Sequence, residues 1–128
     1  MKINYLYLFT LLIIFSCNNN QELNNKKKEL RHVVLIKFKD SVSKNQISNV
    51  VDKFISLRSE IKEIKKFEWG INNSPEHLNK GFTHSFILTF NNEKDRATYL
   101  PHPAHQKFVN HLKPVLEDVL VIDYWVDN

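Results

Sequence analysis

The chain has 128 residues, which is enough for one domain with a sizeable core but not for two. Its hydrophobic content of 42% is typical of a globular protein, and its formal net charge is only +4. The lysines are scattered apart from the run at residues 26–28, and no arginine cluster or aromatic RNA-binding signature is present, so the sequence disfavours nucleic-acid binding. The two glycines, Gly70 and Gly81, are too few for a glycine-rich phosphate loop or a dinucleotide-binding fingerprint.

The N-terminal stretch "MKINYLYLFTLLIIFSC" places one cation, Lys2, before a short apolar run. That run is shorter than the roughly 20 residues that span a bilayer, and it has the length of a signal-peptide core. Its end, "IFSC", resembles the lipobox of bacterial lipoproteins, in which the peptide is cut before a lipid-modified cysteine. We therefore expect residues 1–16 to be a lipoprotein signal peptide and Cys17 to attach the lipid. A plain signal peptide or a single anchor helix is the alternative.

Cys17 is the only cysteine, so no intramolecular disulfide can form and thiolate metal sites are excluded. Residues 17–29 are polar and rich in asparagine, which predicts a flexible tether. The folded domain is expected over residues 30–128. A lipid on Cys17 would hold this domain on a membrane of the bacterial cell envelope, facing the periplasm or the cell surface.

The first half of the domain predicts a strand, a helix and two further strands. Residues 31–40 are a β-branched and aliphatic run of strand length. Apolar residues recur at helical spacing over residues 41–64, and Ser41 or Ser43 can cap that helix. Residues 66–72 and 82–91 predict strands, separated by a loop over residues 73–81.

The second half predicts two helices and a last strand. Residues 92–100 form a short helix behind an asparagine cap at Asn91 or Asn92, and Pro101 ends it. Pro103 suits the first turn of the next helix, residues 103–112, because its missing N–H would lack an intrahelical partner there. Residues 118–127 read as the closing strand. The order β-α-β-β-α-β predicts an α+β, ferredoxin-like fold.

Both faces of the predicted sheet are apolar. In the first strand Val34 and Ile36 point to one face while Val33 and Leu35 point to the other, and the last strand shows the same pattern. Two helices cover one face, and a second copy of the same sheet is the simplest cover for the other. The sequence therefore predicts a homodimer.

Three segments together resemble the stress-responsive A/B barrel (Dabb) domain family: "HVVLIKFK", "FEWGINNSPEHLNKGFTHSFILTF" and "YLPHPAHQKFVNHLKPVLEDVLVIDY". The resemblance covers residues 30–126. It implies a ferredoxin-like protomer whose sheet faces that of a second copy, so that the two form a dimeric α/β barrel.

The resemblance also implies site residues. In a plant polyketide cyclase of this family a histidine and a tyrosine carry an aldol-type ring closure, and they match His105 and Tyr99. Two further pocket histidines match His32 and His84. On this basis His105 and Tyr99 are candidate catalytic residues, and His32 and His84 are candidate ligand-pocket residues.

The residues themselves support part of this assignment. His105 is at about the third helical position, where the positive end of the helix dipole favours a neutral imidazole that can accept a proton. Tyr99, just before the double-proline bend, can donate a hydrogen bond to a substrate oxygen. The alternative is that Tyr99 only packs and His105 makes a structural hydrogen bond. Trp69 and Phe82 are read as core or cavity wall and complete the predicted ligand pocket.

No cofactor and no metal are predicted. His105 and His111 are six residues apart, which places them on different faces of a helix, and no nearby carboxylate completes a zinc site. Three functions remain open: binding of a small, partly apolar molecule in the barrel, proton transfer on a carbonyl compound by His105 and Tyr99, or a dimeric scaffold with no ligand. Export would remove the protein from cytosolic thioesters, which argues against a close copy of the polyketide reaction. The sequence therefore favours a domain of unassigned activity that binds a small molecule, with the enzyme and the scaffold as alternatives.

Overall fold

The computed structural model describes residues 28–127. The predicted signal peptide, Cys17 and nearly all of the predicted tether lie outside these residues. The elements follow in the order β1 (Leu30–Phe38), α1 (Lys44–Glu60), β2 (Lys66–Ile71), β3 (His84–Phe90), α2 (Glu93–Tyr99), α3 (Pro103–Leu112) and β4 (Leu116–Trp125). Within the described part of the chain, no helix is long and apolar enough to cross a membrane.

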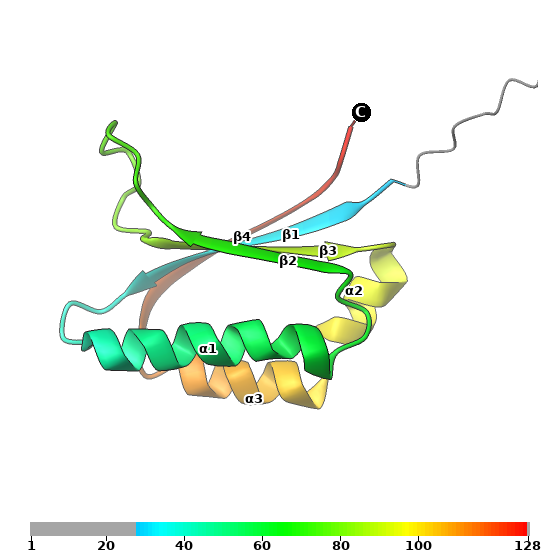
Figure 1. Cartoon of the computed structure of the whole chain (residues 1–128), viewed down its shortest axis with the longest axis horizontal. Helices are drawn as coiled ribbons and strands as arrows, with labels where there is room; N and C mark the ends of the chain where they lie inside the picture. The colour runs from blue at the N-terminus through cyan, green and yellow to red at the C-terminus, as the bar shows by residue number, and fades with distance from the viewer. Residues whose placement is uncertain (1–27, 128) are drawn as a thin grey trace, which may run out of the picture.

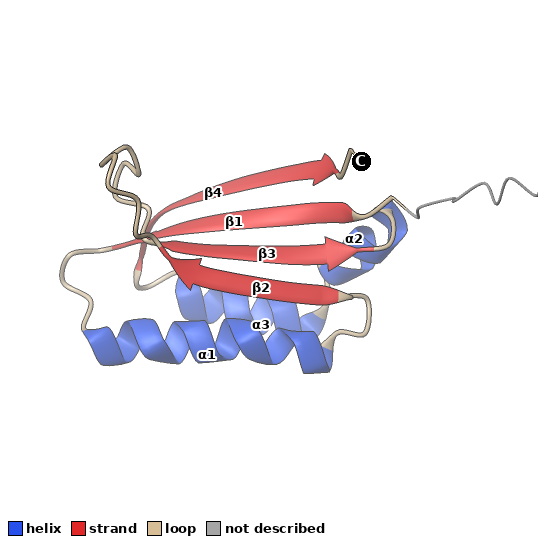
Figure 2. Ribbon diagram, turned by 45° about the horizontal axis from the view of Figure 1, so that its top comes forward, coloured by secondary structure: helices blue, strands red, loops and turns tan. Residues whose placement is uncertain are grey.

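The four strands form one antiparallel sheet in the order β2-β3-β1-β4. Helices α1 and α3 lie side by side on one face of this sheet, and α2 lies near the end of β3 (Figures 1 and 2). The predicted ferredoxin-like fold is confirmed. Its second helical segment is divided into α2 and α3 at the Pro101 bend, where the sequence predicted the break.

Local signals explain where the helices begin. Ser43 caps α1 in a reciprocal capping box: its hydroxyl accepts a hydrogen bond from the Gln46 amide at 3.3 Å, and its own amide donates to the Gln46 side chain at 3.0 Å. Asn92 caps α2, and Pro103 occupies the first turn of α3. Helix α1 ends at Glu60, four residues before the predicted end, although Ile61 and Ile64 remain buried beyond it.

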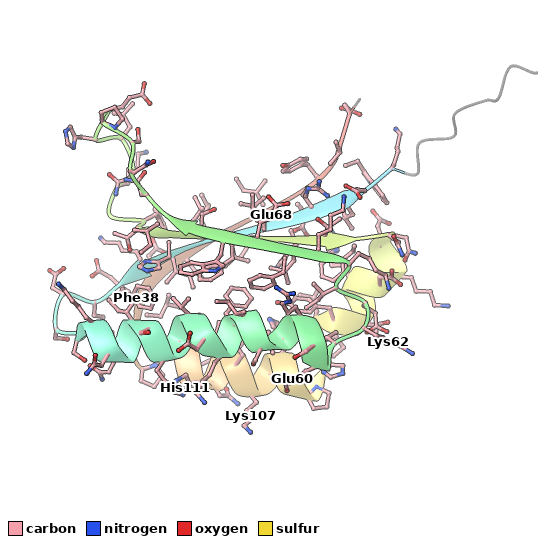
Figure 3. The ribbon with its side chains drawn as sticks, in the orientation of Figure 1. Phe38, Glu60, Lys62, Glu68, Lys107 and His111 are labelled. Carbon is pink, nitrogen blue, oxygen red and sulfur yellow. The ribbon has the colours of Figure 1, made fainter. Side chains whose placement is uncertain are left out.

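The core fills the space between the helices and one face of the sheet, which we call the helix face. Every second residue of β1, from Leu30 to Phe38, is buried there. Phe54 of α1 connects the layers, because its ring lies 4.3 Å from that of Phe108 on α3 and 4.4 Å from that of Phe86 on β3. Figure 3 shows Phe38 between the sheet and α1, while Glu68 lies beyond the opposite face of the sheet.

The opposite face, which we call the open face, has no helix over it. Its apolar side chains come from the three strands β1, β3 and β4, and they are Val33, Leu35, Ile87, Leu120, Ile122 and Tyr124. On the edge strand β4, Ile122 is 50% exposed and Tyr124 is 47% exposed. The sheet therefore carries apolar side chains on both faces, as the sequence predicted, and only one face is covered within the chain.

Candidate functional site

Tyr99 lies at the centre of a cluster of aromatic and imidazole rings where α2, α3, β1 and β3 meet. It is the last residue of α2 and is fully buried. Its ring centroid is 4.3 Å from that of His105, 5.2 Å from that of Phe90 and 5.7 Å from that of His32. The structure therefore brings three of the four predicted tyrosine and histidine site residues together.

The hydroxyl of Tyr99 is the most unusual atom in the cluster. Among the described residues it is the one fully buried side-chain oxygen or nitrogen that has no hydrogen-bond partner. Burial raises the pKa of Tyr99, so the phenol keeps its proton at neutral pH. A buried hydroxyl without a partner lowers the stability of the fold by about 1–3 kcal/mol. The Tyr99 hydroxyl can therefore donate a hydrogen bond to a bound molecule.

His105 packs against the Tyr99 ring, and its tautomer is defined by the backbone. Its Nδ1 lies 2.8 Å from the carbonyl oxygen of Leu100. Because a carbonyl only accepts, Nδ1 carries the proton and Nε2 keeps a free lone pair. Burial lowers the pKa of His105, although the Leu100 hydrogen bond acts in the opposite direction. The lowered pKa keeps the ring neutral. A neutral, half-buried imidazole is suited to accept a proton.

The double-proline bend positions this pair. The His102 amide donates to the carbonyl of Tyr99 at 3.0 Å, and the His102 side chain accepts from the Ala104 amide at 3.2 Å, which caps α3. The bend thus joins the two helices through three residues and places His105 against the ring of Tyr99. The segment that ends one helix and begins the next also builds the candidate site.

His32 belongs to the same cluster through the sheet. It lies on the helix face of β1 and is 5% exposed. Its Nδ1 is 2.6 Å from Oδ1 of Asp123 on β4, and Nη1 of Arg96 on α2 is 2.7 Å from the other oxygen of that carboxylate. Asp123 and Arg96 were missed by the sequence analysis. The available signal was Asp123 itself, a lone carboxylate within the apolar run of the last strand.

His84 lies apart from this cluster. The strand register pairs His32 with Leu88 and Ile36 with His84, so the two histidines share the helix face but are four residues apart along β1. This spacing corresponds to about 13 Å. The His84 ring packs edge-on against Phe38 at 5.2 Å, and its Nδ1 is 2.8 Å from the hydroxyl of Thr83. Burial lowers the pKa of His84.

Two surface hollows lie at the His84 end of the sheet. The first, of about 380 Å³, lies on the open face beneath the β2–β3 hairpin, and its lining includes Phe82, Trp69 and His84. The second, of about 390 Å³, lies between α1 and β2 and is lined by Ile47, Val51, Trp69, Ile71 and His84, among others. We call the second one the edge hollow. Neither hollow is lined by His32, Tyr99 or His105.

The predicted pocket residues thus fall into two groups. Trp69, Phe82 and His84 surround the hollows, whereas His32 joins Tyr99 and His105. Phe86 lies between the groups: it is fully buried, and its ring is 6.1 Å from Trp69 and 4.4 Å from Phe54. Aromatic side chains therefore fill the interior that separates the two groups.

The remaining histidines have other roles. His111 bonds the side chain of Asn49 through Nε2 at 2.7 Å, which ties α3 to α1, and His77 is in the β2–β3 hairpin with a positive φ of 55°. Within residues 28–127, no three histidine, cysteine, aspartate or glutamate side chains gather in a way that could hold a metal ion.

Comparison with known proteins identifies the family. The model of the stress responsive A/B barrel domain matches residues 30–126. The chain belongs to this family. The predicted resemblance to Dabb domains is therefore confirmed.

Two curated plant relatives show how close the chain is to characterised members. A stress-response A/B barrel domain-containing protein of Arabidopsis thaliana is 38% identical over 102 residues, which cover 80% of this chain and 94% of that protein. Olivetolic acid cyclase of Cannabis sativa is 27% identical over 95 residues, which cover 74% of this chain and 94% of the cyclase. The Dabb domain of this chain thus corresponds to nearly the whole length of both relatives.

Solved structures show the same fold. Hydroxynitrile lyase from Passiflora edulis superposes with a TM-score of 0.74 and 26% identity, covering 79% of this chain and 95% of the lyase. A dimeric ferredoxin-like protein of unknown function from Bacteroides fragilis superposes with a TM-score of 0.63 and 26% identity, covering 77% of this chain and 96% of that protein. Members of this fold therefore include a lyase and a dimeric protein.

Proposed function

We propose that this Dabb protein binds a small, partly apolar carbonyl compound at Tyr99 and transfers a proton to and from it. The observation that carries the proposal is the buried Tyr99 hydroxyl without a partner, on a ring whose centroid is 4.3 Å from that of His105, an imidazole with a free Nε2. A carbonyl oxygen would accept the hydrogen bond that the hydroxyl cannot make within the protein. Tyr99 is fully buried and His32 is 5% exposed, whereas His105 is half-buried, so we place the entry of the molecule at His105.

The proton transfer has a simple balance. Nε2 of His105 removes a proton from the carbon next to the carbonyl. The electron pair of that C–H bond forms the C=C bond, and the π pair of the carbonyl moves onto its oxygen to give an enolate. The Tyr99 hydroxyl donates to this oxygen and stabilises its charge. Return of a proton from His105 to the carbon regenerates the carbonyl compound. The names of two relatives, a cyclase and a lyase, support an enzymatic function.

A second candidate function is binding without reaction. The edge hollow favours it, because Trp69 is 45% exposed and Ile71 is 62% exposed beside the buried His84. Exposed apolar side chains around a concave surface are typical of a binding site for an apolar molecule. In this case a ligand would raise the melting temperature of the protein and would be released without chemical change.

A probe with an exchangeable proton next to a carbonyl distinguishes proton transfer from binding without reaction. Acetophenone carries a carbonyl next to a methyl group, and ethylbenzene has a similar shape without the oxygen. In D2O, proton NMR would follow both binding and the loss of the methyl signal of acetophenone. We expect the protein to accelerate this loss, His105→Gln to slow it about a hundredfold while acetophenone still binds, and Tyr99→Phe to weaken binding of acetophenone but not of ethylbenzene.

Each other outcome excludes one candidate. Binding of both probes without exchange would support the carrier and contradict the enzyme. Binding of neither probe, with no exchange, would contradict both and leave the dimeric scaffold. Equal exchange by the native chain and His105→Gln would show that His105 is not the base.

The assembly in which this site works is proposed to be a homodimer in which two open faces meet to form an α/β barrel. The apolar open face and the exposed apolar side chains of β4 support this proposal, as does the dimeric relative from Bacteroides fragilis. The charged residues Glu29, Lys66 and Glu117 rim this face in ion pairs, which leaves its centre apolar.

The proposed location is the bacterial cell envelope, through a lipid on Cys17. The sequence pattern of residues 1–17 supports it, since a short apolar run ends in the only cysteine of the chain. Cells grown with labelled palmitate should transfer the label to the native chain and not to Cys17→Ala. Labelling of both chains alike would contradict a lipid at this residue.

A further inference from the structure

Asp123 connects two elements of the candidate site that are distant in sequence. One of its oxygens lies 2.6 Å from Nδ1 of His32, and the other lies 2.7 Å from a guanidinium nitrogen of Arg96. The three side chains come from β1, β4 and α2, and they are 6%, 29% and 24% exposed, respectively. A carboxylate that is held on both oxygens has a fixed position, and so has the imidazole that it binds.

This contact defines the tautomer of His32. An ionised carboxylate only accepts hydrogen bonds, so Nδ1 of His32 carries the proton and Nε2 has the free lone pair. Arg96 holds the other oxygen of this carboxylate through a contact of 2.7 Å between Nη1 and Oδ2. The hydrogen bonds between the described residues include none to Nε2 of His32.

The arrangement matches that of His105 on the other side of the cluster. There the carbonyl of Leu100 holds the Nδ1 proton, and Nε2 is again the free nitrogen. The rings of both histidines pack against the ring of Tyr99, with centroids 5.7 Å and 4.3 Å away. Two imidazoles with a free Nε2 therefore contact the Tyr99 ring. The backbone holds the ring of His105, and the Asp123–Arg96 ion pair holds the ring of His32.

We infer that Arg96 and Asp123 are positioning residues that make His32 a second proton acceptor of the site. This inference rests on the proposed function at Tyr99 and extends it. A bound carbonyl compound would have one acceptor in His105 and another in His32, so that protons can be removed from two positions of the same molecule. When Nε2 of His32 takes a proton from a C–H or O–H bond, the electron pair stays on the substrate and Asp123 stabilises the imidazolium. The proton leaves His32 by the reverse step.

The groups that face His32 are few. Asp123 of β4 contacts its Nδ1 and is held in turn by Arg96 of α2, while the rings of Tyr99 and Phe90 have centroids 5.7 Å and 6.3 Å from that of His32. His105 of α3 joins the same cluster through the ring of Tyr99. Asp123 is thus the one carboxylate among the described residues that is bonded to the His32 ring.

The tautomer provides a test that does not need a substrate. Long-range proton–nitrogen NMR of the whole chain labelled with 15N-histidine distinguishes a ring protonated at Nδ1 from one protonated at Nε2. We expect the Nδ1–H form for His32 in the native chain and in Asp123→Asn, whose amide oxygen still accepts. Asp123→Leu should shift most of the population to the Nε2–H form, and Arg96→Leu should shift a smaller part. The amide spectrum of each variant shows whether the fold is kept.

The acetophenone exchange measures the consequence for the site. The residual exchange of His105→Gln should fall by a further factor of about ten in His105→Gln/Asp123→Leu, and Asp123→Asn in the same background should retain it. An Nε2–H tautomer in native His32, or a tautomer unchanged by Asp123→Leu, would overturn the inference and leave the proposed role of His105 intact. If the tautomers behave as expected but the native chain shows no exchange, the proposed function fails and the positioning by Asp123 stands. If the double variants exchange equally, His32 is not an acceptor.

Discussion

Tyr99 is a residue whose environment costs stability. Its hydroxyl is fully buried and has no partner among the described residues, while its ring is packed by three others. Structural tyrosines in a core bond their hydroxyl, because an unpaired one is costly. An unpaired buried polar atom is typical of a binding site, where a residue lowers the stability of the ligand-free protein but contacts the ligand when it is bound.

Tyr99→Phe tests this cost directly. We expect the free energy of unfolding to stay the same or to rise on the order of 1 kcal/mol, because the variant removes an unpaired polar atom and keeps the ring. Tyr99→Leu removes the ring as well and should lower it by about 2 kcal/mol or more. Urea denaturation measures both values. A loss of more than about 1 kcal/mol in Tyr99→Phe would mean that the hydroxyl has a partner in the folded protein.

His84 predicts how stability depends on pH. Burial lowers its pKa in the folded state below the ordinary value of 6.5, so the unfolded chain binds a proton at a higher pH than the folded chain does. Because the unfolded chain takes up the proton first, the His84 ring lowers the free energy of unfolding as the pH falls below about 6.5. We expect His84→Gln to lose less stability than the native chain between about pH 7.5 and pH 5.5.

Urea denaturation at several pH values checks this expectation. His77→Asn is the matched control, because His77 lies in the hairpin with a positive φ that asparagine tolerates. The control should keep the pH dependence of the native chain. If His84→Gln shows the same pH dependence as the native chain, the buried His84 ring does not contribute to the pH dependence of stability.

At the scale of elements, the β2–β3 hairpin depends on one glycine. Gly81 has a φ of +84°, and a Cβ built on it would lie 2.6 Å from Cε of Lys37. Gly70, in the neighbouring strand, has no atom within 4 Å of the same position. The two glycines of the chain thus differ in both backbone conformation and space.

Gly81→Ala should lower the free energy of unfolding by about 1–3 kcal/mol, because alanine is strained at that φ and Lys37 must move. Gly70→Ala should raise it by up to about 1 kcal/mol, since a strand glycine loses more backbone freedom on folding than alanine does. Chemical denaturation of the two variants side by side measures the difference. Equal values would show that the hairpin relaxes around the new side chain.

Most elements could be predicted from the sequence because their signals are local. The Ser43 cap, the prolines at 101 and 103 and the two-residue alternation of β1 each depend on neighbours within a few positions. The end of α1 was overestimated, since Ile61 and Ile64 continue the apolar pattern but are buried from a loop. Periodicity reports burial, and burial does not require a helix.

The site could be predicted only in part, because its contacts are distant in sequence. The bend predicted that Tyr99 and His105 meet, and the family resemblance added His32 and His84. The partner of His32 is Asp123, 91 residues away, and it is fixed by the register of β1 with β4. Similarly, the aromatic side chains that separate His84 from the cluster come from three elements, and a single sequence does not reveal that they stack.

At the scale of the molecule, the open face is the largest feature that the chain does not cover itself. Figure 1 shows the helices on one side of the sheet and only the β2–β3 hairpin and the end of the chain rising on the other. Edge strand β4 exposes its apolar side chains on both faces, from Val119 to Trp125. Contiguous apolar surface of this kind on a small domain is typical of an interface.

Ile122→Lys tests whether two open faces meet. Ile122 is at the centre of the exposed part of β4, and burying an unpaired ammonium there against a second sheet would cost several kcal/mol. We expect light scattering to give twice the mass of one chain for the native protein and the mass of one chain for the variant. The melting temperature should rise with concentration only for the native protein, since dimerisation stabilises by mass action. Leu100→Lys is the matched control, because Leu100 is 43% exposed at the end of α2, among the helices and not on the open face. The control should remain dimeric, and a dimeric Ile122→Lys variant would show that the chains meet through another surface.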